Sequence, residues 1–376
     1  MKRVALLCAT LALLGAVYAT FTLRAAEKMP DFEVYWRAAD RASRAEPLYR
    51  AEDGHYQLKY LPAFAILAVP LAWVPLPVAK ALWFALSVGV LAAFIALSIS
   101  LLPDRRTRVW VLALSAVIAM AKFYGHELVL GQVNLLLGAV VAGAVYVLGR
   151  GRNSLAGLLL ALAAIVKPYA VIFLPWLAGI GSGRALVAAT TALAAALAMP
   201  VAVYGVSGAS SLYVAWWQTV STSTAPNLLN ADNVSLAAMY AKWLGPGPTA
   251  GALALATAGA LLALAADVVR RRTGLVGPSG LEAALLLTLM PLLSPQGWDY
   301  LLLLATPAVV FLVNYADRLP AWLRVAAGIA VATSAFSLFD IMGRRAYGTF
   351  MALSIITVCF LVVIVALYAL RVRRAA

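Results

Sequence analysis

The sequence predicts an all-α integral membrane protein that crosses the bilayer many times. Of its 376 residues, 64% are hydrophobic and 12% are charged, and the mean hydropathy is +0.92. Soluble domains hold roughly 45–50% apolar and about 25% charged residues, so a water-soluble core could not bury this much apolar surface. Apolar stretches of about 20 residues also recur along the chain, which is the length that a helix needs to cross a hydrocarbon core of about 30 Å.

The apolar runs fall into two groups. Long runs occupy residues 4–23, 78–102, 128–148, 185–204, 249–269 and 349–370. Shorter runs, each a tilted span, a half-span or a re-entrant piece, occupy residues 60–76, 109–121, 154–167, 170–181, 281–293, 299–315 and 322–340. Together they predict one polytopic membrane domain, 1–376, with about 12–13 transmembrane helices. The run 4–23 is longer than the core of a signal peptide and is followed by many spans, which favours a retained anchor over a cleaved signal.

Basic residues predict the orientation, because cytoplasmic loops collect Lys and Arg. Lys2–Arg3 and Arg371 place both termini inside and favour an even number of spans, and Arg184 and Arg270–Arg272 also indicate inside loops. The three arginines within 105–108 fall outside by a strict count, so either this loop is an exception or one short run upstream does not cross. The net charge of +14 lies largely in such loops and does not indicate a nucleic-acid partner.

Two longer segments are predicted to be external loops that carry short helices. Residues 24–59 hold seven acidic and seven basic side chains and therefore no net charge, which favours the outer side. This first external loop contains Asp31 near its start, which either caps a short surface helix or acts as a catalytic base, with Glu33 as the alternative acid. Residues 206–248 form the second predicted external loop, in which the pair Trp216–Trp217 is typical of an interfacial anchor.

Polar residues also interrupt the apolar runs, where a charge is costly and indicates a functional site. Lys167 precedes a helix-breaking proline and either holds an anion or extends its amine to the membrane surface. The amides of Gln132, Asn134 and Asn233 either cap helices or bind sugar hydroxyls. The remaining candidates are Ser235 and Lys242 near the outer surface, and the aromatic residues Tyr35 and Trp298, the latter in a break over 294–300 that predicts a pocket.

Several reaction classes are excluded by what the sequence lacks. It has no phosphate-binding Walker motif, no glycine-rich dinucleotide turn and no clustered zinc ligands, and His55 and His126 are its only histidines. ATP hydrolysis, hydride transfer and zinc-dependent proteolysis are therefore not expected. An external carboxylate, basic groups for a phosphate, and amides and aromatics for a sugar suit the transfer of a sugar from a lipid-phosphate donor to a hydroxyl. Such a reaction requires no metal or other cofactor, because the phosphate leaves with its own charge.

Seven motifs in order resemble a known family. They are DFEVYW (31–36), AEPLYR (45–50), YLP (60–62), GQVN (131–134), IVKPY (165–169), NVS (233–235) and LLSPQGWDY (292–300). This order resembles glycosyltransferase family 87, the polyprenyl-phosphate-mannose-dependent mannosyltransferases of the GT-C superfamily. The resemblance implies a GT-C-type helical bundle and an inverting displacement with Asp31 as general base. It also implies pocket or phosphate contacts for Gln132, Asn134, Lys167, Asn233, Ser235 and Trp298. The chain departs from the family pattern at Lys242, where Arg is common, and at Tyr300, where His is frequent.

The sequence as a whole thus predicts a hexosyltransferase of the cell inner (plasma) membrane with its active site facing the outside or the periplasm. It would move a sugar from a polyprenyl phosphate carrier to a hydroxyl of a glycan or glycolipid, and mannose is the favoured sugar. The alternative is a flippase or transporter of lipid-linked sugars, which would use the same pocket without transfer chemistry. The partners of the predicted glycosyltransferase would be membrane lipid, the lipid-linked donor and the acceptor. A third alternative, a structural scaffold, has little in its favour.

Overall fold

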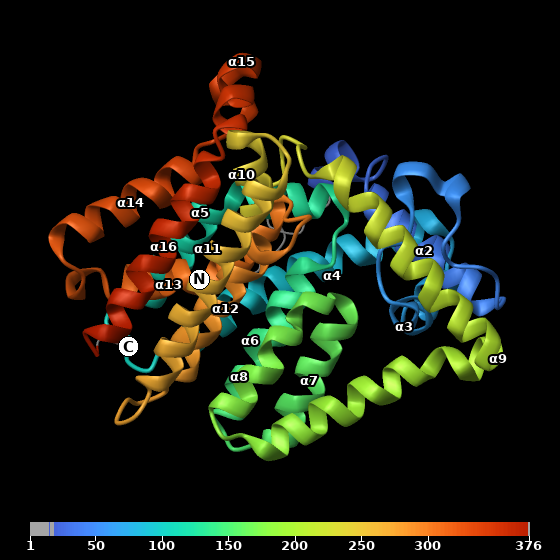
Figure 1. Ribbon diagram of the computed structural model, residues 1–376, viewed down its shortest axis with the longest axis horizontal. Coiled ribbons are helices and arrows are strands. Elements are labelled where there is room, and N and C mark those ends of the chain that lie inside the picture. The colour runs from blue at the N-terminus through green and yellow to red at the C-terminus, as the bar shows by residue number, and fades with distance from the viewer. Residues whose placement is uncertain (1–14, 16–18, 375–376) are drawn as a thin grey trace, which may run out of the picture.

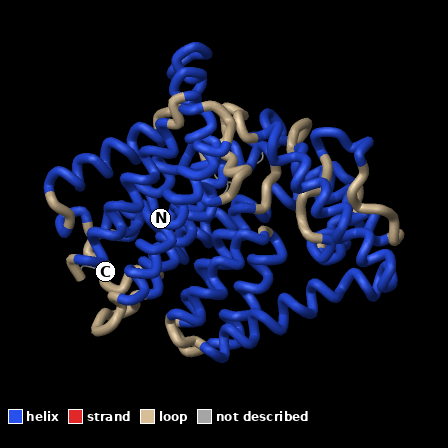
Figure 2. Tube along the Cα trace, viewed as in Figure 1, coloured by secondary structure: helices blue, strands red, loops and turns tan. Residues whose placement is uncertain are grey.

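The computed structural model describes residues 15 and 19–374, and the chain over these residues is helical, without a β-strand (Figures 1 and 2). The α-helices are α2 Pro30–Ser43, α3 Pro62–Leu67, α4 Leu76–Ser100, α5 Val109–Leu130, α6 Asn134–Leu148, α7 Asn153–Val166, α8 Phe173–Gly179, α9 Gly183–Asn227, α10 Leu236–Leu244, α11 Pro248–Arg270, α12 Ser279–Leu293, α13 Thr306–Asn314, α14 Ala321–Ala335, α15 Phe339–Ala352 and α16 Ile355–Val372. Short 3₁₀ or π-helical segments are η1 Phe21–Ala25, η2 Ala51–Tyr56, η3 Val69–Trp73, η4 Pro168–Ile172, η5 Asp299–Ala305 and η6 Ala316–Arg318. The predicted fold class is confirmed.

Fewer helices can span the membrane alone than the 12–13 predicted. Among the described residues, α4, α5, α9, α11 and α16 are long and apolar enough, and the pair α14 and α15, bent by 105°, would add a sixth. Several other apolar runs form shorter helices, such as α7 with 14 residues. At about 1.5 Å per residue such a helix covers only about 21 Å, less than the hydrocarbon core. The predicted first span, 4–23, falls mostly outside the described residues.

A glycine explains why the predicted span 128–148 is not one helix. α5 continues past the predicted end of its own run to Leu130, and α6 begins at Asn134. Between them Gly131 adopts a left-handed conformation with φ +68°, and a Cβ there would lie 2.7 Å from the Cβ of Phe32. Only glycine fits both the dihedral angle and the space. The helix therefore breaks at the residue before Gln132.

The segment 206–248 is mostly helical rather than a loop. α9 has 45 residues and turns sharply at Gly205, after which its second arm runs to Asn227. The polar run within this arm stays helical because its hydroxyls bond back to helix carbonyls, as Thr222 does to Gln218 and Thr224 to Val220. α10 follows, so within this segment only 228–235 and 245–247 connect helices by irregular backbone. α3 contacts α9, and Figure 1 shows α3 beside the second arm of α9.

Ion pairs close the charged segment 24–59 upon itself. Both oxygens of Asp53 accept from the guanidinium of Arg41, at 2.5 and 2.8 Å. Glu33 accepts from Arg37 at 3.1 Å and from Lys80 on α4 at 2.6 Å, which ties the segment to the bundle. Acidic and basic side chains of this segment therefore pair with one another and stabilise its fold.

Four connections lie together at one end of the bundle. The α4–α5, α6–α7, α8–α9 and α11–α12 connections contribute residues to a single cavity. The arginines of 105–108 are therefore at the same end as Arg184 and Arg270–Arg272. This arrangement agrees with the second alternative above, that an upstream run does not cross, because 60–76 forms only α3 with six residues and η3 with five.

Candidate functional site

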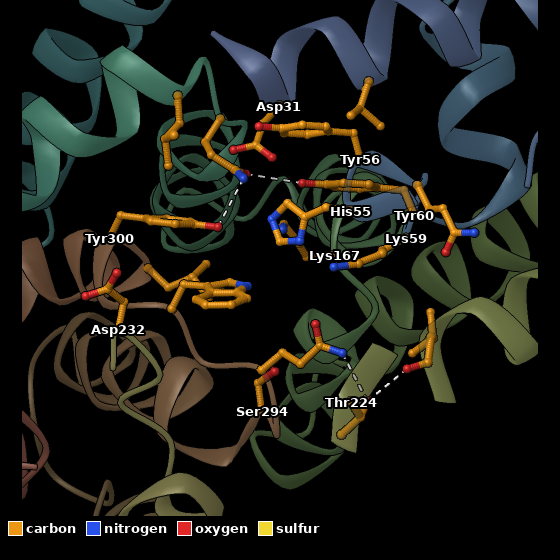
Figure 3. A pocket seen from close by; sticks show the side chains of 18 of the residues that line it. Asp31, His55, Tyr56, Lys59, Tyr60, Lys167, Thr224, Asp232, Ser294 and Tyr300 are labelled. Atoms are coloured by element: carbon orange, nitrogen blue, oxygen red, sulfur yellow. Dashed lines mark hydrogen bonds between the residues drawn. The ribbon is translucent and has the colours of Figure 1, made fainter. Parts of the chain in front are cut away.

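A cavity of about 580 Å³ opens at the end of the bundle opposite those four connections. α7 and α12 each lead from the connections at one end to this cavity at the other, where Lys167 and Ser294 line it. Five of the nine predicted site residues line the cavity, namely Asp31, Tyr35, Gln132, Lys167 and Trp298. Figure 3 shows Asp31 and Lys167 facing this common space.

Asp31 lies in the first turn of α2, on the cavity wall. The helix starts with Pro30 after Met29, whose backbone is left-handed at φ 61° and whose N–H donates to the carbonyl of Val129 at 3.0 Å. Burial raises the pKa of the Asp31 carboxyl above its usual value, while Gln132 and the charges of Lys167 and Lys59 act in the opposite direction. Glu33 is already paired with Lys80 and does not line the cavity, so Asp31 is the acid of this segment that is available to a ligand.

Nitrogen-bearing side chains face Asp31 across the cavity. Lys167 lies at the break between α7 and η4, where its extended backbone precedes Pro168, and its Nζ is 4.5 Å from the centre of the Tyr60 ring. Lys59 and His55 come from the charged segment 24–59 and line the same cavity (Figure 3). Burial lowers the pKa of the Lys59 amine, and the negative charge of Asp31 acts against that effect. The arrangement offers an anion at least two positive charges from separate parts of the chain.

The amide of Gln132 connects three tyrosines around the acid. Its Oε1 accepts from the hydroxyls of Tyr35 at 2.9 Å and Tyr60 at 3.3 Å, and its Nε2 donates to the hydroxyl of Tyr300 at 3.1 Å. Gln132 is 5% exposed, so these bonds are buried. This network fixes the aromatic wall of the cavity because each hydroxyl is held by the same amide.

Glu127 lies next to this network and binds the first turn of α6. Its carboxylate accepts from the backbone N–H groups of Asn134 at 2.5 Å and Leu135 at 3.0 Å, and from the Asn134 side chain at 2.8 Å. These N–H groups belong to the first turn of α6 and have no partner within the helix, so Glu127 caps α6 although it lies on α5. Sequence reasoning did not identify Glu127 as functional.

Trp298 reaches the cavity through a paired stretch of backbone. Asn233 and Trp298 form an isolated antiparallel bridge, with the N–H of Val234 donating to the carbonyl of Gly297 at 2.6 Å. A Cβ at position 297 would lie 1.9 Å from the carbonyl oxygen of Pro291, so glycine is required there. The predicted break over 294–300 is thus joined to the connection before α10.

Four predicted site residues do not line the cavity, and their polar atoms hold the chain together instead. Asn134 binds Glu127, and the Asn233 side chain donates to the carbonyls of Asn227 at 3.0 Å and Pro295 at 2.9 Å. The Ser235 Oγ accepts from the N–H of Ala238 at 3.1 Å and caps α10. The Lys242 amine donates to the carbonyls of Ala231 at 2.9 Å and Asn233 at 2.8 Å. Each of the four side chains thus makes contacts within the protein, and the contacts with substrate expected for them stay predictions.

A second charged cluster borders the cavity. Asp299 is 1% exposed and pairs with Nδ1 of His126 at 3.1 Å and with Nζ of Lys122 at 3.4 Å. His126 packs edge-on against the Tyr300 ring, with 5.2 Å between ring centres. Burial and the nearby charge of Asp299 raise the pKa of Asp232, which lines the cavity together with His126.

Several cavity residues were not predicted as site residues, namely His55, Lys59, Tyr60, His126, Tyr169 and Asp232. Some signals were present, since Tyr60 opens the YLP motif and the two histidines are the only ones in the chain. Tyr169 lines the cavity, and its hydroxyl is buried without a hydrogen-bond partner among the described residues. Over the same residues, no group of three or more His, Cys, Asp or Glu side chains is arranged to hold a metal ion.

The fold and the cavity define a class of membrane-embedded protein, one in which a carboxylate, cations and aromatics meet at one end of a helical bundle. The sequence model of glycosyltransferase family 87 matches residues 58–295, more than half of the chain. The chain belongs to this family and is a membrane glycosyltransferase. The matched region contains Gln132 and Lys167, whereas Asp31 lies before it and Trp298 after it. No curated protein and no solved structure is significantly similar to the chain.

Proposed function

We propose that this chain transfers mannose from a polyprenyl phosphate carrier to a hydroxyl of a glycan or glycolipid on the outer face of the inner membrane. Asp31 acts as the general base. The donor, the acceptor and membrane lipid are the partners, and the reaction uses no further cofactor. Family membership favours this transfer reaction over transport of a lipid-linked sugar without chemistry.

One observation carries the proposal: a carboxylate and cations from separate elements face the same cavity. Asp31 comes from the start of α2, Lys59 from the segment that follows η2, and Lys167 from the end of α7. A base for the acceptor and charges for a departing phosphate are the two requirements of sugar transfer from a lipid phosphate. Aromatic rings such as Tyr60, Trp298 and Tyr300 suit the apolar faces of a sugar ring, and the Tyr169 hydroxyl suits its polar edge.

The chemistry proceeds in one displacement. The Asp31 carboxylate takes the proton of the acceptor hydroxyl, and the acceptor oxygen forms a bond to the anomeric carbon of the sugar. The bond from that carbon to the phosphate oxygen breaks on the opposite side, so the configuration inverts. The electron pair leaves with the polyprenyl phosphate, whose charge is stabilised by Lys167 and Lys59. A carboxyl whose pKa is raised by burial is a stronger base than an exposed aspartate, which suits this role.

The test is transfer of labelled mannose from synthetic polyprenyl-phosphate mannose to membrane lipids or glycans. The intact protein is compared with Asp31→Asn, and Asp40→Asn serves as the matched control because Asp40 is on the same helix but outside the cavity. We expect the control to transfer normally and Asp31→Asn to lose about 10²–10⁴-fold in rate.

Two results would contradict the proposal in different ways. Equal rates for Asp31→Asn and the parent would show that another group is the base. If the intact protein transfers glucose or another sugar from its polyprenyl phosphate but not mannose, the donor is misassigned while the reaction class stands.

Lys167→Gln should raise the KM for the lipid-linked donor more than it lowers kcat, since the Lys167 amine is proposed to meet the donor phosphate.

A further inference from the structure

The end of the bundle opposite the candidate active site carries a second cavity, of about 630 Å³. It lies where the α4–α5, α6–α7, α8–α9 and α11–α12 connections meet, and its polar lining includes Arg150, Asn153, Ser182, Arg272 and Ser279. α7 separates it from Lys167 by 14 residues, which is about 21 Å of helix. It is therefore a site distinct from the one described above.

The lining of this cavity is positively charged. It contains Arg150 and Arg272 but no aspartate or glutamate. The Arg150 guanidinium rests over the Tyr146 ring at 4.1 Å and is in no ion pair with a described residue. It is exposed, so its charge is accessible to a ligand. The Arg272 guanidinium donates to Oγ of Ser279 at 3.2 Å.

Glu282 lies close behind this lining and is paired with two arginines. Glu282 is 1% exposed; it accepts from Nε1 of Trp176 at 2.9 Å and pairs with Arg371 at 3.5 Å and Arg272 at 3.8 Å. Arg371 is 0% exposed and donates to the carbonyl of Pro278, a lining residue, at 2.7 Å. Its Nε and Nη1 have no hydrogen-bond partner among the described residues. Glu282 thus pairs with two arginines, and Arg150, which is in no ion pair within the described chain, adds a further positive charge to the lining.

Backbone groups add to this field. α7, α9 and α12 begin at Asn153, Gly183 and Ser279, beside the cavity, and none of these helices is capped by a side chain at its N-cap residue. Helix N-termini carry unpaired N–H groups and a partial positive charge, which favour an anion. Ser182 lines the same cavity, and its buried Oγ has no hydrogen-bond partner in the described chain.

We propose that this cavity binds a phosphate group, carried either by an anionic phospholipid of the adjacent leaflet or by a soluble phosphate compound. Tetrahedral phosphate oxygens suit guanidinium groups and helix N-termini arranged around one space. The sequence predicts that this end of the bundle, with its basic loops, faces the cytoplasm, and basic pockets between membrane helices on that side bind anionic lipid head groups.

The test measures binding to the purified full-length protein in neutral detergent. Phosphatidylglycerol, phosphatidylcholine and inorganic phosphate are the probes; native mass spectrometry counts bound lipid, and thermal unfolding reports binding of inorganic phosphate. We expect Arg150→Gln to weaken binding of the phosphate-bearing probe roughly tenfold, the loss of one charge-assisted hydrogen bond. Arg184→Gln is the matched control, because Arg184 is an exposed arginine at the same end that does not line the cavity.

Each result decides between the sources or rejects the proposal. Tight binding of phosphatidylglycerol that depends on Arg150 assigns a lipid head group, and Arg150-dependent binding of inorganic phosphate alone assigns a soluble compound. Equal binding by Arg150→Gln and Arg184→Gln would overturn the site. So would equal retention of phosphatidylglycerol and phosphatidylcholine, if inorganic phosphate also left thermal unfolding unchanged. Tyr146→Leu keeps the charge but removes the ring that supports Arg150, and should weaken binding less than Arg150→Gln does.

Discussion

Replacing Glu127 should destabilise both the bundle and the cavity, although Glu127 does not line the cavity. Its carboxylate accepts hydrogen bonds at 2.5, 2.8 and 3.0 Å from two backbone N–H groups and one side-chain amide, all of which are buried. Glu127→Leu would leave all three donors unpaired away from water. Glu127→Gln keeps an oxygen for the backbone N–H groups but turns an NH₂ group towards the amide of Asn134.

The expected loss in the free energy of unfolding follows from the strength of these hydrogen bonds. A hydrogen bond to a charged group contributes about 1.5–3 kcal/mol, and bonds that share one partner are not additive. We therefore expect Glu127→Leu to lower the free energy of unfolding by roughly 3–6 kcal/mol, and Glu127→Gln by about 1–3 kcal/mol. Glu52→Gln, the same change at an exposed carboxylate, should stay within about 0.5 kcal/mol of the parent.

The assay is reversible unfolding in mixed micelles, followed by sugar transfer with the fraction of each variant that remains folded. Because Glu127 caps the helix that follows Gln132, we expect the folded fraction of Glu127→Leu to transfer more slowly than the parent. The reasoning would be refuted if Glu127→Leu unfolded with the same free energy as Glu52→Gln. A stable Glu127→Leu protein would mean that the N-terminus of α6 finds another partner.

Two further predictions concern the acid and a residue outside the cavity. The positive charge of Lys59 lowers the pKa of Asp31, so Lys59→Gln should raise that pKa. Because the base must be ionised, the acid limb of the pH profile of kcat/KM should then move to higher pH. A profile that moves no further than that of the control Lys28→Gln would contradict this prediction. Ser235→Ala should lower the free energy of unfolding by about 1 kcal/mol through loss of the α10 cap, with transfer per folded molecule unchanged; a large loss of transfer at unchanged stability would instead favour a direct contact with substrate.

The sequence predicted those elements that a single local signal specifies. The uninterrupted apolar runs 78–102 and 249–269 correspond closely to α4 and α11, because length and apolarity alone determine them. The break at Gly131 was not predicted, since the need for glycine arises from contact with Phe32, about a hundred residues earlier in the chain. The polar arm of α9 was also missed, because hydroxyl groups can serve a loop or a helix equally well.

The candidate site shows the same division. Asp31, Lys167 and Trp298 could be identified because a charge or a helix break within apolar surroundings needs an explanation. Asn233 and Lys242 carry equally suitable groups, but an amide or amine can bind a sugar or its own backbone, and only the three-dimensional arrangement decides between these uses. The pairing of Glu127 with α6 had no local signal, because a carboxylate on one helix caps the next.

The position of the cavity residues at helix starts and breaks has a consequence for biogenesis. Asp31, Gln132, Lys167 and Trp298 lie where a helix begins or is interrupted, rather than in the middle of a span. A charged residue at the centre of a membrane helix costs about 2.5–3.5 kcal/mol on insertion, whereas one near an end costs far less. The apolar segments that border these residues can therefore enter the bilayer during synthesis before the polar groups find one another. Changes to the chemistry of the pocket need not compromise insertion of the helices that hold it.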